Sequence, residues 1–91
     1  MATRNKTLIK ELSTPTASYQ IYDRNGKVFV SELQGNVLRR LKILKHVAAL
    51  LIAYPSPSTI TDRCKQLLDE AQQQGSSDFY LVKTNDKTRS D

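Results

Sequence analysis

The pair Asn25-Gly26 constrains the fold more than any other feature of the chain. It stands between two segments, Tyr19–Arg24 and Lys27–Ser31, that are rich in β-branched and aromatic residues and alternate in polarity. Asn and Gly suit the two positive-φ positions of a type I′ turn, so the pattern predicts a β-hairpin. Because a two-residue loop fixes the register, we expect these cross-strand pairs: Arg24 with Lys27, Asp23 with Val28, Tyr22 with Phe29, and Ile21 with Val30.

The predicted hairpin has one aliphatic face and one polar, aromatic face. Tyr19, Ile21, Val28 and Val30 share the first, which is the better core face; the second carries Gln20, Tyr22, Arg24, Lys27, Phe29 and Ser31. Tyr22 and Phe29 would lie side by side with Arg24 and Lys27 beside them, an arrangement that suits stacking of unpaired bases. The alternative is that the N-terminal segment, a helix or a second subunit covers the two rings.

A long helix is predicted next, beginning at Asn36 because Gly35 inside a helix would be unfavourable. Val37, Leu41, Leu44, Ala48 and Leu51 recur at alternating four- and three-residue spacing and form one apolar stripe. Every residue from Val47 to Tyr54 is apolar, so this half should be buried in the core or in a subunit interface. Pro55 and Pro57 then end the helix.

A second helix is expected from Ser58 or Thr59 to Gly75, with Thr59–Asp62 as a capping box. Asp78–Lys83 should return to the sheet as a short strand. We therefore predict one α+β domain over 18–83, a small antiparallel sheet packed on a two-helix hairpin in the order β-β-α-α-β. Residues 1–17 should be mostly mobile, with Thr7–Leu12 either a helical turn or an edge strand, and 84–91 should be a disordered tail.

The reactive residue types are too dispersed to predict an enzyme, a metal site or a cofactor. His46 follows Lys45 with no carboxylate placed to orient it, and Cys64 falls on the apolar stripe of the second helix. Asp69 and Glu70 are neighbours that point in different directions. The longest apolar run, Val47–Tyr54, is far shorter than the roughly 20 residues of a membrane span. We expect a cytoplasmic or nucleoplasmic protein, not a secreted one.

The positive charge points to an anionic partner. Lysine and arginine number 14 against 9 acidic residues, a formal net charge of +5. On the predicted long helix Arg39, Arg40, Lys42 and Lys45 would form a cationic ridge opposite the apolar stripe. We therefore expect a small nucleic-acid-binding or regulatory protein that contacts DNA or RNA through this ridge and through the hairpin face of Tyr22, Arg24, Lys27 and Phe29.

The alternative is a non-enzymatic protein-protein interaction module, a subunit, adaptor or inhibitor. It would oligomerise or dock through the apolar segment 47–54, and its basic ridge would face an acidic protein surface. A homodimer is compatible with both hypotheses, since small basic regulators are often symmetric dimers.

Overall fold

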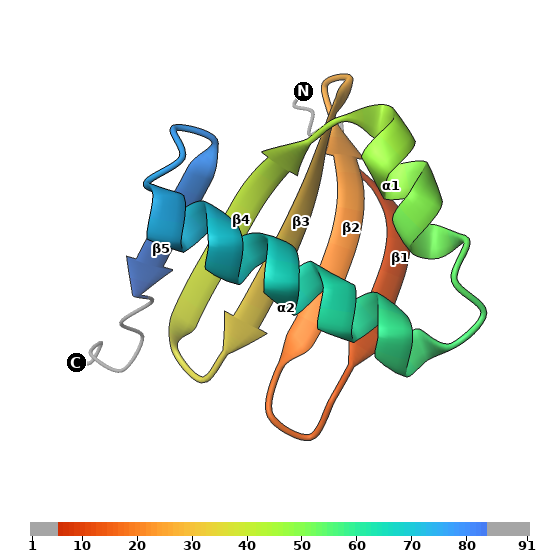
Figure 1. Cartoon of the computed structure of the whole chain (residues 1–91), viewed down its shortest axis with the longest axis horizontal. Helices are drawn as coiled ribbons and strands as arrows, with labels where there is room; N and C mark the ends of the chain where they lie inside the picture. Colours follow the sequence, from red (N-terminus) through yellow and green to blue (C-terminus); the bar gives the residue numbers. More distant parts are fainter. Residues whose placement is uncertain (1–5, 84–91) are drawn as a thin grey trace.

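The computed structural model of the chain describes residues 6–83, which form a five-stranded sheet and two helices (Figure 1). The elements are β1 Lys6–Ser13, β2 Ser18–Arg24, β3 Lys27–Gln34, β4 Val37–Ile43, α1 Lys45–Ile52, α2 Pro57–Gln74 and β5 Phe79–Lys83. The strands lie in the order β1-β2-β3-β4-β5 and every neighbouring pair is antiparallel. Both helices lie on one face of the sheet, with α2 running across the strands (Figure 1). The predicted α+β class, a sheet packed on a helix pair, is confirmed.

The β2–β3 hairpin has the predicted turn and register. Asn25 has a φ of 56° and Gly26 a φ of 82°, as a type I′ turn requires. Tyr22 pairs with Phe29 and Arg24 with Lys27. The Asp23 carboxylate accepts a hydrogen bond of 3.0 Å from the Gly26 amide, which adds a local tie to the turn.

The predicted helix from Asn36 is wrong over its first half, which is strand β4. Gly35 and Asn36 form a second two-residue turn, closed by the pair Gln34–Val37, and Gly35 has a φ of 62°. Gly-Asn between two strands is itself a hairpin signal, with Gly at the positive-φ position of a type II′ turn. Leu44, extended at φ −75° and ψ 151°, precedes the first residue of α1.

The apolar stripe predicted for that helix is correspondingly divided. Leu41 is a buried residue of strand β4, and Ala48 and Leu51 are buried residues of helix α1. Leu44, which we expected in the core, is 64% exposed because it lies at the strand-to-helix junction. The segment 47–54 is not buried all round either, since Leu50 is 65% exposed.

Helix α2 follows the sequence closely. Pro57 occupies the first turn, Cys64 and Leu68 are fully buried, and Gly75 ends the helix with a φ of 65°. The predicted capping box is absent: the Thr61 hydroxyl donates to the Ser58 carbonyl at 3.0 Å, and the N-cap Ser56 makes no side-chain capping bond. Burial raises the pKa of the Cys64 thiol to about 11, so this residue packs as a small hydrophobic group.

Strand β1 resolves the alternative for Thr7–Leu12 in favour of an edge strand. It pairs with β2 along its length, with an irregularity of register between Leu8 and Lys10. Leu12 packs against the core that fills the space between the sheet and the helices. The predicted tail, residues 84–91, lies outside the described residues.

Candidate nucleic-acid interface

The face of the sheet opposite the helices carries most of the predicted binding residues. Side chains alternate along each strand, and Tyr19, Ile21, Val30 and Leu41 point into the core. Their strand neighbours therefore point to the other side, which we call the open face. It carries Lys6, Leu8, Glu11, Gln20, Tyr22, Arg24, Lys27, Phe29, Ser31, Leu33, Leu38, Arg40, Lys42, Tyr80 and Val82.

The open face changes in character from one end of the strands to the other. Lys6, Arg24 and Lys27 form a cationic row at the β2–β3 turn. At the opposite end, the row of Leu33, Leu38 and Val82 is apolar. The chemistry that could hold an anion is therefore concentrated at the turn end and the middle of the face.

A ladder of rings and cations crosses the middle of the open face. Lys6 Nζ lies 4.5 Å from the centroid of the Tyr22 ring, and Tyr22 stacks on Phe29 at 5.5 Å with an interplanar angle of 28°. The Arg40 guanidinium lies 5.2 Å from the Phe29 ring and 4.7 Å from the Tyr80 ring. Cation–π contacts of this kind favour a guanidinium that lies over the two rings.

The ladder does not expose its rings equally. Tyr22 is 5% exposed and Phe29 half-buried, whereas Tyr80 is 51% exposed. Lys6 of β1 lies over Tyr22. The N-terminal segment therefore covers this ring, which agrees with the alternative to base stacking at Tyr22. The accessible aromatic residue is Tyr80, which we did not predict as a site residue, because its place beside Arg40 depends on the pairing of β5 with β4.

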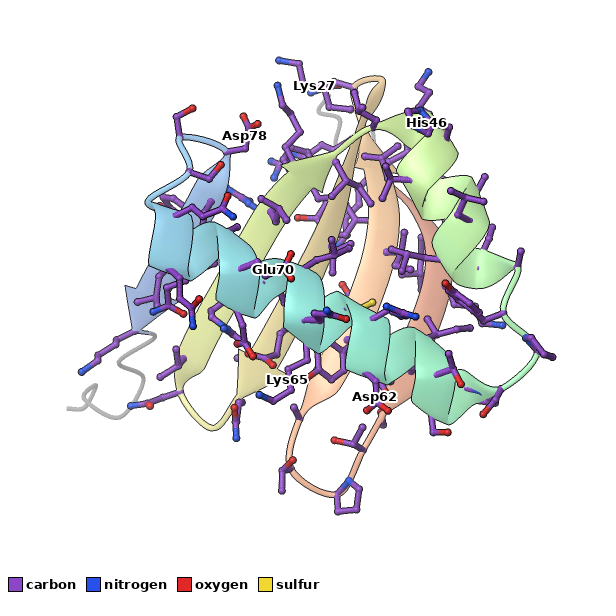
Figure 2. The ribbon with its side chains drawn as sticks, in the orientation of Figure 1. Lys27, His46, Asp62, Lys65, Glu70 and Asp78 are labelled. Atoms are coloured by element: carbon purple, nitrogen blue, oxygen red, sulfur yellow. The ribbon has the colours of Figure 1, made fainter. Side chains whose placement is uncertain are left out.

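The four cations of the predicted helical ridge lie in three different places. Arg40 and Lys42 alternate along β4 and lie on the open face. Lys45 is exposed in the first turn of α1, next to His46, which Figure 2 shows at the same end of the molecule as Lys27. Arg39 points to the helix side and is buried. The prediction of a continuous cationic ridge on one helix is thus wrong, because Arg39, Arg40 and Lys42 belong to a strand.

Arg39 is bound inside the protein by a polar network. Its Nε donates to Glu32 Oε1 at 2.7 Å, and its Nη1 donates to Asp69 Oδ1 at 2.7 Å and to Gln72 Oε1 at 3.1 Å. The Tyr19 hydroxyl donates to the second Glu32 oxygen at 2.7 Å. With its donors used in this way, Arg39 is not available to a phosphate.

The pKa shifts in this network keep its charges fixed. Burial opposes ionisation of Glu32, but the hydrogen bonds from Arg39 and Tyr19 outweigh burial and lower the pKa of its carboxyl. Burial and the hydrogen bond to Glu32 raise the pKa of Tyr19. The hydrogen bond to Glu32 also raises the pKa of Arg39. The network therefore ties α2 to the sheet at neutral pH and carries no titrating group there.

Carboxylates are sparse on the open face. Glu11 is the acidic residue on the strands of this face within residues 6–83; its Oε2 accepts a hydrogen bond of 3.2 Å from Gln20. Asp78, just before β5, lies 3.8 Å from Lys42 Nζ in an exposed ion pair. Lys6, Arg24, Lys27, Arg40 and Lys42 thus face solvent or rings with little opposing charge.

Neither a metal-binding group nor a membrane-spanning helix occurs among residues 6–83. No group of three or more His, Cys, Asp and Glu side chains there could hold a metal ion. No helix among residues 6–83 is long and apolar enough to cross a membrane. A hollow on the open face has a volume of about 150 Å³ and is lined by Gln20, Ser31, Leu33 and Leu38 among others.

No family model, no curated protein and no solved structure matches this chain.

Proposed function

We propose that the protein binds nucleic acid on the open face of the sheet, with single strands preferred over duplex. The observation that carries this proposal is the guanidinium of Arg40 held between Phe29 and Tyr80, on a face with five cations and a single strand carboxylate within residues 6–83. Cations supply affinity for phosphates, and an exposed ring supplies a surface for a base. We propose no catalytic role for these residues.

Phosphates would be held by the cations at the turn end and the middle of the face. Arg24, Lys27 and Lys42 are exposed and can follow a flexible backbone. Arg40 differs because its guanidinium already contacts two rings, so it should lose little rotamer freedom when it binds a phosphate. Binding through these groups releases counterions and should weaken with salt.

The preference for single strands follows from the shape of the surface and from Tyr80. A broad sheet face cannot enter the major groove of DNA as a helix or a two-stranded ribbon does. Unpaired bases, in contrast, can splay and stack on an aromatic side chain presented by a sheet. Tyr80 is the exposed ring at the end of the ladder.

Fluorescence anisotropy with single-stranded and duplex oligonucleotides at several salt concentrations tests the proposal. Arg40→Ala and Lys42→Ala should each reduce the slope of log affinity against log salt by about 0.7 on a single strand. Lys65→Ala removes the same charge from the helix side of the molecule, where Figure 2 shows Lys65, and should leave the slope unchanged.

Failure of the wild-type protein to bind either oligonucleotide at low salt would overturn the proposal. The open face would then fit an acidic protein surface, the alternative partner for the same cations. If Lys65→Ala lost as much affinity as Arg40→Ala and Lys42→Ala, binding would depend on the net charge of the protein and not on the cations of the open face.

A further inference from the structure

An apolar groove lies between the two helices, on the side of the molecule away from the open face. It has a volume of about 270 Å³. Its apolar lining consists of Val47, Leu50, Leu51, Tyr54 and Leu67. We call it the α1–α2 groove.

The apolar side chains around the groove are poorly covered in the single chain. Leu50 is 65% exposed and Tyr54 is 36% exposed. Helix α1 buries Ala48 and Leu51 against the rest of the protein, whereas Leu50 and Ile52 are exposed. Contiguous exposed apolar surface rimmed by polar groups is typical of an interaction site.

The polar rim of the groove is complementary to itself. Arg63, Gln66 and Glu70 line it along α2, and they occupy positions i, i+3 and i+7 of one helix face. At 1.5 Å rise per residue, Arg63 and Glu70 are separated by roughly 10 Å along the axis. The rim therefore carries a cation at one end and a carboxylate at the other. Between them the Gln66 amide accepts a hydrogen bond from Arg63 at 3.2 Å and donates one to Glu70 at 3.5 Å.

We infer that the α1–α2 groove binds a second copy of this chain in a two-fold symmetric dimer. A two-fold axis near Gln66 would bring Arg63 of each protomer against Glu70 of the other, while Leu50 and Tyr54 fill the facing groove. An isologous interface requires this kind of self-complementarity. A partner of uniform charge would be attracted at one end of the rim and repelled at the other.

The terminal segments of the chain are poor alternative occupants. Residues 84–91 consist of Thr, Ser, Asn, Asp, Lys and Arg, and residues 1–5 contain Met1 and Ala2 as their apolar side chains. Neither segment has the apolar surface that the groove would bury. The inference does not depend on the proposed function, because the helices and the open face lie on opposite sides of the sheet (Figure 1).

Sedimentation equilibrium across a range of protein concentrations tests the inference. The wild-type protein should show a monomer–dimer equilibrium. Leu50→Asp should weaken association roughly thirtyfold, the effect of losing a central apolar contact, and should still fold because Leu50 is exposed. A wild-type protein that stays monomeric at the highest concentration, or a Leu50→Asp variant that dimerises as tightly as the wild type, would overturn it.

Charge reversal gives a test that is specific to the two-fold arrangement. Arg63→Glu alone would oppose two carboxylates at each contact, and Glu70→Arg alone would oppose two cations, so both variants should be largely monomeric. Mixed together they should form a heterodimer, because each of the two contacts would then join a carboxylate of the Arg63→Glu chain to a guanidinium of the Glu70→Arg chain. Absence of heterodimers in the mixture, with each variant folded by circular dichroism, would refute the symmetric contact.

A matched control lies on the same helix. In Figure 2, Glu70 lies on the side of α2 turned toward α1, and Asp62 lies on the other side. Asp62→Lys changes the net charge as much as Glu70→Arg does, and it should leave dimerisation unchanged. A loss of dimerisation equal to that of Glu70→Arg would show that net charge, and not the rim contact, controls association.

Discussion

Arg39 and Glu32 form a buried ion pair at the contact between β3, β4 and α2, and they are the residues whose substitution should affect folding most. Each is satisfied by a second partner, Asp69 for Arg39 and Tyr19 for Glu32. Removing one partner of such a pair leaves an uncompensated charge. We predict that Arg39→Ala lowers the free energy of unfolding by about 3 to 5 kcal/mol, measured by urea denaturation. Arg40→Ala, on the open face, is the control and should cost far less.

The lowered pKa of Glu32 predicts how stability depends on pH. A carboxyl whose pKa is lower in the folded than in the unfolded protein stabilises the fold above the unfolded value, about 4.3, and loses this contribution as pH falls through the folded value. Wild-type protein should therefore lose stability steadily below about pH 4. Glu32→Gln should be less stable at pH 7 and flatter in this acid range. An equal acid slope in both proteins would assign the effect to other carboxyls, such as Asp69, whose pKa is lowered by its hydrogen bond to Arg39.

Leu44 and Leu68 provide a second test at the level of single residues. Leu68 is fully buried, so Leu68→Ala should cost about 2 to 5 kcal/mol through lost contacts and a cavity. Leu44 is 64% exposed, and Leu44→Ala should cost under about 1 kcal/mol. Urea denaturation of both variants measures the difference. Similar losses in the two variants would place Leu44 in the core, as its helical spacing suggested.

The two β-turns show how much of the element order could be read from the sequence. The Asn25-Gly26 hairpin was predictable in turn type, register and faces because the information is local. Gly35-Asn36 carries a similar signal, but Leu41, Leu44, Ala48 and Leu51 coincide with helical spacing across the β4–α1 junction. Because of that coincidence we predicted a helix where strand β4 lies. We therefore did not predict that Arg39 lies on the opposite face of the sheet from Arg40 and Lys42.

The candidate site could be predicted only in part for the same reason. Arg24, Lys27 and Phe29 followed from one hairpin, whose faces are fixed by its turn. The places of Arg40, Lys42 and Tyr80 depend on the β3–β4 and β4–β5 pairings, which join residues distant in the sequence. Alternation within a single strand does not reveal which strand lies next to it.

Substitution of Gly35 tests the turn between β3 and β4. Its φ of 62° is unfavourable for residues with a Cβ, although nothing lies within 4 Å of the place where a Cβ would stand. Gly35→Ala should therefore cost about 1 to 2 kcal/mol through backbone strain alone. Gly35→Asn should cost less, since Asn is among the residues that dominate turns of this class. Thermal denaturation measures both, and a neutral Gly35→Ala would argue against this turn.

Substitution of the two tyrosines on the open face should distinguish residues needed for folding stability from residues needed for nucleic-acid binding. Tyr80→Ala removes an exposed ring, and we predict a loss of about 1 to 3 kcal/mol in single-strand affinity, with little change for duplex or for folding. Tyr22→Ala removes a buried ring and should instead cost about 3 kcal/mol of folding stability. Anisotropy and urea denaturation on both variants check the pair. Unchanged single-strand binding by Tyr80→Ala would remove base stacking from the proposal.

The place of β5 in the topology has a consequence for the order in which the molecule is completed. Strands β1 to β4 follow one another through short turns, so their contacts are local and can form early. Among residues 6–83, strand β5 pairs with one strand, β4, and α1 and α2 separate these two strands in the sequence. Backbone amides of Phe79–Lys83 should therefore exchange with solvent faster than those of β3, through local opening of the last strand. Each opening takes Tyr80 away from Arg40, so a ligand that stacks on Tyr80 should slow exchange in β5 more than anywhere else in the chain.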